Sequence, residues 1–336
     1  MPLGCLGLFI LVCLLAVGLV FSIGRGVTNA FSALPTTIPL KKEVIADEIL
    51  LKEGSAKKIA QIDIEGVIMS SAGRGLSMVD EIKGLLEHAV SDDNVAAIVV
   101  RVNSPGGEVT ASDVLYNAVK NAAAKKPVVI YMDSIAASGG YYLACGGDHI
   151  IANPTTLTGS IGVIIQTINY KEMTDKIGVS MVTFKSGQFK DMLSGSREVT
   201  PAESAYVSSL VMESYERFLG IVSEARDIPV EQLRGTPNVD GRIYSGKTAV
   251  DNNMIDATGY IEDAWAEAMK RGGASDAKVV RYRMRHSLAD LFAFLGQANA
   301  EQADGKRVTL DVSDRLIPRM QSGTPYYLYL PTGDSE

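Results

Sequence analysis

The chain is poor in cysteine and in basic charge, and each shortage excludes a class of protein. Only three cysteines occur in 336 residues. Cys5 and Cys13 lie in an apolar N-terminal segment, which leaves Cys145 alone and provides no disulfide framework. A formal net charge of −7 argues against a nucleic-acid partner, because such proteins need basic patches for the phosphate groups.

One segment lacks charged residues altogether, Leu3–Gly24, which is followed by Arg25. A helix of this length can cross the roughly 30 Å hydrocarbon layer of a membrane. A signal peptide cleaved after Ala30 is the alternative, but the apolar stretch is long for one and no basic residues precede it. We expect residues 1–25 to be a transmembrane anchor and residues 26–56 to be a linker.

The rest of the chain alternates between short β-branched runs and longer segments with helical spacing. The expected strands are 44–51, 58–64, 95–102, 127–132, 149–151, 161–168, 179–184 and 279–284. The expected helices are 78–90, 111–124 and 201–225. Thr200, Pro201 and Glu203 form a capping-box signature at the start of the last helix. This alternation predicts an α/β domain with largely buried strands.

The most informative stretch is Asp133–Gly140, with the sequence Asp-Ser-Ile-Ala-Ala-Ser-Gly-Gly. An expected strand leads into it and a mostly apolar segment follows, so the small residues must turn a strand into a helix. Ser138 would lie at the start of that helix, where unpaired N–H groups favour developing negative charge. The position suits a nucleophile, provided that another side chain activates it.

Histidine, the usual activating base, is scarce in this chain. His88 lies in an expected helix, His149 in an expected strand and His286 in a late basic segment, and each stays a candidate. A lysine can serve instead if it is neutral. An ordinary lysine, with a pKa near 10.4, is neutral only about once in two to three thousand molecules at pH 7. A lysine base must therefore be partly buried.

Lys190 fits that requirement best, because it follows the β-branched run 179–184 and has Phe189 and Met192 nearby. Lys185, five residues earlier, is a rival on spacing alone. Taken without other information, both lysines could equally be solvated residues beside a strand.

Lys190 and Ser138 belong to a longer series of motifs in the chain. The series is Ser104-Pro105-Gly106-Gly107, Ala136–Tyr142, Ala152-Asn153-Pro154, Thr158–Val163, Gly187–Lys190 and Gly241–Tyr244, with Gly246, Ala249, Ile255 and Asp256. In this order it resembles the signal peptide peptidase A family of serine–lysine proteases, in its short bacterial form with one catalytic domain. Asn253 stands where the family usually has glycine, and asparagine tolerates the left-handed conformation that such a turn needs.

The resemblance implies a role for each site residue. Ser138 would be the nucleophile and Lys190 the general base, with Ser160 hydrogen-bonding to the lysine amine and orienting it. The glycine turn after the strand 95–102 allows close approach of substrate backbone, so the N–H groups of Gly107 and Gly139 are candidates for the oxyanion hole. No cofactor or metal ion is implied.

The resemblance also implies a fold, a location and partners. The fold would be the spiral of ββα units shared by Clp proteases and crotonases, over residues 57–275, with 276–336 as a C-terminal extension that could pack in an oligomer. Released signal peptides and similar apolar peptides would be the substrates of a ring-like homo-oligomer. The catalytic domain would lie outside the bacterial cytoplasmic membrane, although Arg25, Lys41 and Lys42 after the apolar segment mildly favour the opposite orientation.

Two other functions are compatible with the same fold. A crotonase-type acyl-CoA enzyme would use a similar glycine turn but would need neither Ser138 nor Lys190. A catalytically inert membrane scaffold would need none of these residues. The aromatic segment Pro325–Pro331 is expected to pack on the core or on a neighbouring subunit, with a visit to the active-site groove as the alternative.

Overall fold

The computed structural model of this chain describes residues 46–70, 77–284 and 326–328. Nine of the described strands form one mixed sheet, and two more form a short separate ladder. The strands are β1 (Ala46–Lys52), β2 (Ser55–Glu65), β3 (Val95–Ser104), β4 (Gly106–Glu108), β5 (Val128–Ala137), β6 (His149–Ala152), β7 (Leu157–Gly159), β8 (Ile243–Ser245), β9 (Ala257–Thr258), β10 (Ala277–Met284) and β11 (Tyr326–Leu328). The helices are α2 (Met78–Ser91), α3 (Val109–Ala123), α4 (Gly139–Ala144), α5 (Lys171–Lys176), α6 (Pro201–Arg226), α7 (Val230–Arg234), α8 (Gly246–Asp251) and α9 (Ile261–Arg271), with a 3₁₀ turn at Pro237–Val239.

The strand order across the large sheet is β1-β10-β2-β3-β5-β6-β9. The strands from β10 to β9 are parallel, and β1 pairs antiparallel with β10 at the edge. β7 joins the carboxyl end of β5 in parallel and then pairs antiparallel with β8. The turns after β3, β5 and β7 therefore meet at one edge of the sheet, which is where open α/β sheets place their ligands.

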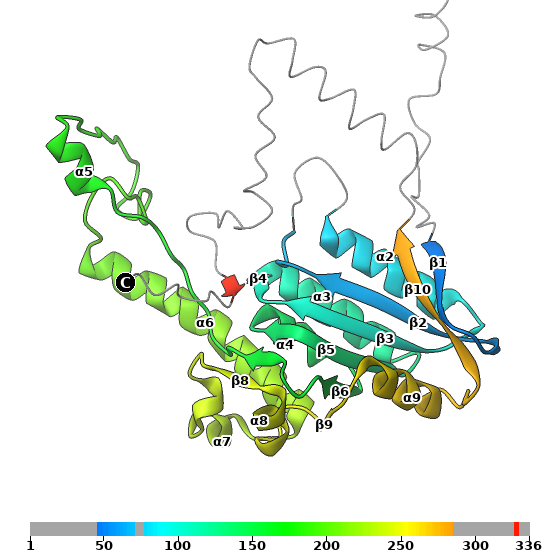
Figure 1. Cartoon of the computed structure of the whole chain (residues 1–336). Helices are drawn as coiled ribbons and strands as arrows, with labels where there is room; N and C mark the ends of the chain where they lie inside the picture. The colour runs from blue at the N-terminus through cyan, green and yellow to red at the C-terminus, as the bar shows by residue number, and fades with distance from the viewer. Residues whose placement is uncertain (1–45, 71–76, 285–325, 329–336) are drawn as a thin grey trace, which may run out of the picture. The chain divides into compact units, whose positions relative to one another are not determined.

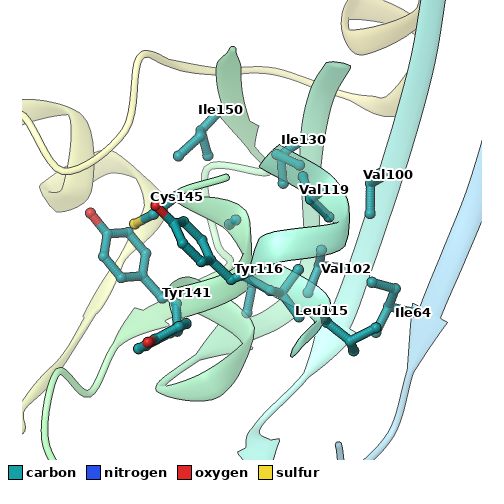
Figure 2. Packing of buried hydrophobic residues seen from close by; sticks show 14 of the residues in the cluster. Ile64, Val100, Val102, Leu115, Tyr116, Val119, Ile130, Tyr141, Cys145 and Ile150 are labelled. Atoms are coloured by element: carbon teal, nitrogen blue, oxygen red, sulfur yellow. The ribbon is translucent and has the colours of Figure 1, made fainter. Parts of the chain in front are cut away.

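Helices cover both faces of the sheet, so the central strands are buried on both sides, as parallel strands usually are. α2 and α3 lie on one face and α9 lies on the other (Figure 1). Figure 2 shows Leu115 and Val119 of α3 packed over Val100 and Ile130 of the strands, and all four side chains are fully buried. α4, which follows Ser138, is buried along its whole length. The nucleophile candidate therefore begins a helix that is fixed in the core.

Most of the expected elements are confirmed by the structure. The helices predicted at 78–90, 111–124 and 201–225 are α2, α3 and α6, and the predicted capping box of Thr200 and Glu203 is present. The sheet also extends beyond residues 57–275, because β1 and β10 lie outside those bounds and pair within it.

Two predicted strands are wrong. Residues 161–168 contain only an isolated bridge at Ile164, and residues 179–184 form no strand. All six residues of the second run are exposed, so the β-branched side chains meet no partner strand within the described chain. Strand propensity depends on such a partner, which sequence composition does not supply.

We call residues 164–199, between β7 and α6, the arm. Its one helix, α5, has no buried residue. Many of its large apolar side chains are exposed to solvent: Ile164, Ile168, Tyr170, Met173, Ile177, Val179, Met181, Val182, Phe184, Phe189 and Val199. Apolar surface of this extent usually marks a site of interaction with another protein or a membrane.

No helix in the described ranges is both long and apolar enough to cross a membrane. The anchor predicted at residues 1–25 and most of the predicted linker lie outside those ranges.

Candidate active site

Ser138 stands alone between β5 and α4, with backbone angles φ 53° and ψ −113° that few non-glycine residues adopt. Its N–H donates to the carbonyl oxygen of Gly159 at 2.8 Å, and its own carbonyl accepts from the N–H of Tyr142 at 2.8 Å. The next turn of chain passes very close to β3, since a Cβ on Gly140 would lie 2.8 Å from the carbonyl oxygen of Ser104. A sharp, strained turn from strand to helix is the geometry that presents a nucleophilic serine in α/β hydrolases.

Ser160 lies beside this turn. β5 and β7 pair in register, with Ala137 opposite Gly159, so the two serines follow paired residues of neighbouring strands. Ser160 also has a positive φ, 52°, and its N–H donates to the carbonyl oxygen of Arg242 at 2.7 Å. Ser138 and Ser160 therefore lie close together at the level of the backbone.

The glycine turn lies on the other side of Ser138, because Ser104 pairs with Ala136 in the β3–β5 ladder. The Ser104 hydroxyl accepts from the N–H of Gly106 at 3.1 Å and fixes the turn. Gly106 and Glu108 both bond to Ile68, through the Gly106 carbonyl and the Glu108 N–H at 2.8 Å each. Backbone groups of successive strand residues point to opposite sides, so the N–H of Gly107 points away from Ile68.

Only glycine fits at position 107. A Cβ there would lie 1.9 Å from the carbonyl oxygen of Ile68. The edge of β4 that points away from Ile68 pairs antiparallel with β11, and this pairing sets Tyr327 opposite Gly107. A segment near the C-terminus therefore runs as an extended strand alongside the candidate oxyanion turn. This placement agrees with the alternative expectation, a visit to the groove, rather than with the first one.

Gly139 is the first residue of α4, where the helix leaves N–H groups without a partner inside the helix. The structure thus gathers Ser138, Ser160, Gly107 and Gly139 at the carboxyl edge of the sheet. These four residues are the part of the predicted site that one chain brings together.

Lys190 is not brought to this edge by the single chain. It lies in the arm, it is exposed rather than partly buried as expected, and among the residues that the structure describes its amine has no hydrogen bond or ion pair. Lys185 differs from it, because its amine contacts the Asp191 carboxylate at 2.7 Å. The expectation of burial is therefore wrong for an isolated chain, because no element among the described residues covers the Lys190 side chain.

The two histidines that are described lie away from Ser138. His149 pairs with Val129 at the opposite end of β5, nine residues or roughly 30 Å along the strand from Ser138. His88 packs edge-on against Tyr282 at 5.0 Å between ring centres. His286 lies outside the described residues.

The side chains of α4 and its neighbours serve packing and hydrogen bonding within the fold. Burial raises the pKa of the Cys145 thiol to about 12, so this cysteine stays an uncharged thiol packed in the core. The Tyr141 hydroxyl donates to the carbonyl of Met254 at 2.7 Å. Asn253, just before it, has φ 58°, which confirms that asparagine here adopts the left-handed conformation.

Comparisons with known proteins agree with this arrangement. Residues 55–167 match the Clp protease family model, and residues 120–275 match the model of peptidase family S49. A protein of Enterococcus faecium named as a candidate signal peptide peptidase SppA is 34% identical over 301 residues, which cover 85% of this chain and 84% of that protein. The chloroplast serine protease SPPA of Arabidopsis thaliana is 32% identical over 207 residues, and Protease 4 of Salmonella typhi is 37% identical over 180 residues. These matches cover 60% and 53% of this chain but only 30% and 28% of those longer proteins.

The strained serine between strand and helix, together with the matches to the models of peptidase family S49 and of the Clp proteases, defines the molecule as a serine-type peptidase. The chain belongs to peptidase family S49, in the group that contains the signal peptide peptidases A.

Proposed function

We propose that the protein is a membrane-anchored endopeptidase that degrades released signal peptides and similar apolar peptides with a Ser138–Lys190 dyad. The observation that carries the proposal is the strained Ser138, set between Ser160 and the Gly107 turn. The family match favours peptide hydrolysis over an acyl-CoA reaction or an inert scaffold.

In the proposed reaction the neutral amine of Lys190 takes the proton of the Ser138 hydroxyl. The serine oxygen then attacks the carbonyl carbon of the peptide bond. The N–H groups of Gly107 and Gly139 donate to the oxyanion, the lysine returns its proton to the leaving amine, and an acyl-enzyme forms. Water hydrolyses this ester by the same steps. Ser160 accepts a hydrogen bond from the amine and keeps it directed at Ser138.

Lys190 would reach Ser138 from a neighbouring copy of the chain. Two features of the arm support this arrangement: its many exposed apolar side chains, and the exposure of Lys190 itself. Packing of the arm against a second copy would cover the apolar surface and would bury the lysine, which is what a neutral amine requires. The ring-like oligomer that the family resemblance implies would complete one active site at each junction.

The substrate would bind as an extended strand along β4. The pairing of β11 with β4 supports this, because it gives an example of a peptide segment docked beside Gly107 by backbone contacts. Recognition through the backbone demands little of the substrate sequence. An anchor at residues 1–25 would hold the enzyme in the bacterial cytoplasmic membrane, with the catalytic domain on its outer side, where signal peptides are released.

A serine-reactive phosphonate tests the proposal most directly. The full chain in detergent should be labelled at Ser138, and Ser138→Ala and Lys190→Ala should each abolish peptide cleavage while the protein stays folded. Lys185→Ala should have only a mild effect. Peptidase activity should rise as the pH increases from 7 towards 10, because the lysine amine must lose its proton. Peptidase activity that does not change from pH 5 to 10, or labelling at another serine, would contradict the proposal.

A further inference from the structure

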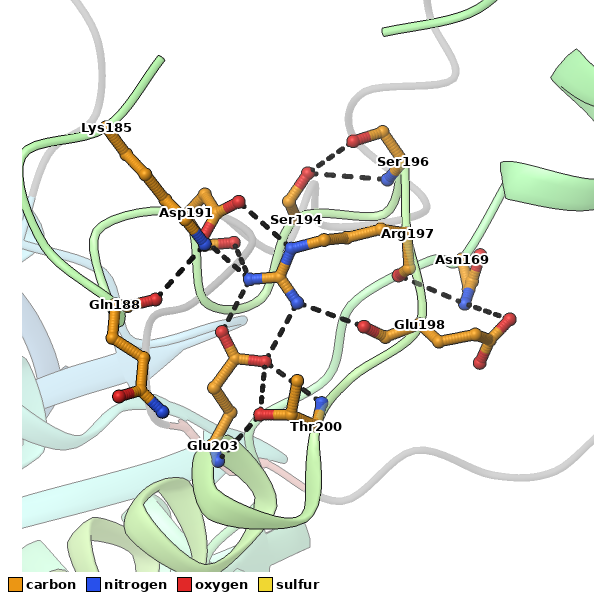
Figure 3. A network of polar contacts seen from close by, with 10 residues as sticks. All are labelled: Asn169, Lys185, Gln188, Asp191, Ser194, Ser196, Arg197, Glu198, Thr200 and Glu203. Carbon is orange, nitrogen blue, oxygen red and sulfur yellow. Dashed lines mark hydrogen bonds and ion pairs between the residues drawn. The ribbon is translucent and has the colours of Figure 1, made fainter. Parts of the chain in front are cut away.

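Arg197, at the base of the arm, bridges two carboxylates that belong to different elements. Its Nε donates to Asp191 Oδ2 at 2.9 Å and its Nη2 donates to Asp191 Oδ1 at 2.6 Å. Its Nη1 donates to Glu203 Oε2 at 2.9 Å, and Nη2 also contacts Glu203 Oε1 (Figure 3). A planar guanidinium can make these paired contacts on two sides, and a lysine amine cannot.

The Glu203 end of this bridge is fixed in the first turn of α6. Glu203 is only 1% exposed, although glutamate is rarely buried unless it is paired. Its carboxylate also accepts from the N–H and the hydroxyl of Thr200, both at 3.0 Å, in the capping box of α6. The other half of α6 is anchored by Phe218 and Val222, which are fully buried in the core.

The Asp191 end of the bridge adjoins Lys190 in the sequence. On the other side of Lys190, the ring of Phe189 packs against the ring of Tyr206 from α6, with 5.5 Å between their centres. The backbone of Lys190 is thus held to α6 through both of its neighbours, while its own side chain stays exposed.

Contact with Arg197 also keeps the pKa of Glu203 at about 2, so that carboxylate remains charged at any working pH.

We propose that Arg197 is a positioning residue: by tying Asp191 to Glu203 it fixes the backbone from which Lys190 reaches Ser138 of a neighbouring copy. The inference rests on the proposed function, since it needs Lys190 to be the base. A reacting group displaced by about 1 Å can cost as much as 100-fold in rate, so a base on an unsupported loop would be inefficient.

The test measures kcat and KM of the full chain in detergent with a fluorogenic apolar peptide. Arg197→Met should lower kcat at least tenfold and leave KM within twofold, because a displaced base slows the chemical step and leaves the binding strand intact. Arg234→Met is the matched control. It removes another arginine that pairs with a glutamate of α6, Glu216, and it should keep the wild-type kcat.

A double variant identifies the residue through which Arg197 acts. In single-turnover acylation by an activated ester, Lys190→Ala and Lys190→Ala/Arg197→Met should react at the same residual rate, because the arginine has no role once the base is absent. A further tenfold loss in the double variant would overturn the positioning role, since Arg197 would then serve folding or assembly.

A second variant, Asp191→Asn, keeps the inference testable if Arg197→Met does not fold. It breaks the bridge at the loop end and leaves Glu203 paired with Arg197, and we expect the same loss of kcat. Wild-type kcat in Asp191→Asn, with Lys190→Ala inactive, would disprove the inference and leave the dyad standing. Full activity in Lys190→Ala would disprove the dyad, and the inference with it.

Discussion

Ser138 and Ser160 both hold backbone conformations that side chains normally avoid. Such residues typically cost about 1–3 kcal/mol each and persist only where the surroundings impose them. Here the β5–β7 ladder and the hydrogen bonds to Gly159 and Arg242 impose them. Strain at both serines of a candidate site indicates that their geometry serves chemistry rather than stability.

Replacing the strained nucleophile with glycine should therefore stabilise the fold. Ser138→Gly is expected to be about 1 kcal/mol more stable to urea than Ser138→Ala, because glycine accepts the positive φ without strain and only part of this gain is lost to the freer unfolded chain. Both variants should be inactive. Fluorescence of Trp265, the only tryptophan, reports the unfolding. Equal stability of the two variants would show that position 138 is unstrained.

At the residue scale, the sequence predicts turns of the backbone better than it predicts contacts between side chains. The Gly-Gly after Ser138 and Asn253 led to turns that the structure confirms, because glycine and asparagine act through their own backbone. The bridge through Arg197 was not predicted. The capping box pointed to Glu203, but the pattern cannot show that the same carboxylate also binds an arginine.

Among the elements, one carboxylate after α2 binds side chains of two strands near the edge of the sheet. Asp92, just after α2, accepts from the Lys58 amine of β2 at 2.9 Å and from the Tyr282 hydroxyl of β10 at 3.0 Å. Burial alone would raise the pKa of this carboxyl, but these hydrogen bonds and one from the N–H of Asn94 outweigh burial and lower the pKa to about 2. Asp92 thus links α2 to two strands that are distant in the sequence.

This link should make stability depend on pH. The pKa of Asp92 is lower in the folded chain than in the unfolded one, so its contribution is present above about pH 4 and is lost as the pH falls towards 2. Asp92→Asn should cost about 2 kcal/mol at pH 7 and clearly less at pH 3, measured by urea denaturation. Asp93→Asn, an exposed neighbour, is the control. A cost that does not change with pH would contradict the assignment.

The strands that the sequence predicted correctly are those that pair with another strand of the same chain. The runs 58–64, 95–102 and 127–132 pair with one another and were recognised from their apolar pattern. The run 179–184 is also rich in apolar and β-branched residues, but it has no partner in the described chain and forms no strand. Composition records the preference of a segment, whereas pairing depends on what lies beside it.

For the whole molecule, the proposed sharing of the dyad predicts complementation between inactive chains. Ser138→Ala keeps Lys190, and Lys190→Ala keeps Ser138, so mixed oligomers should contain some junctions with both groups intact. A mixture that is dissociated and reassembled in equal amounts should recover about a quarter of the wild-type activity if neighbours assort at random, measured by peptide cleavage. Recovery should be absent when the two variants are mixed without exchange of subunits, and no recovery after exchange would place both groups in one chain.

The exposure of Lys190 has a consequence for the control of proteolysis, because it implies that a single chain is inactive. In the proposed arrangement a newly made single chain would carry the Ser138 hydroxyl and the Lys190 amine on separate surfaces, and so would not cleave peptides. If the dyad is shared as proposed, proteolysis would begin only where copies of the chain gather at high local density, and dilution would switch it off again.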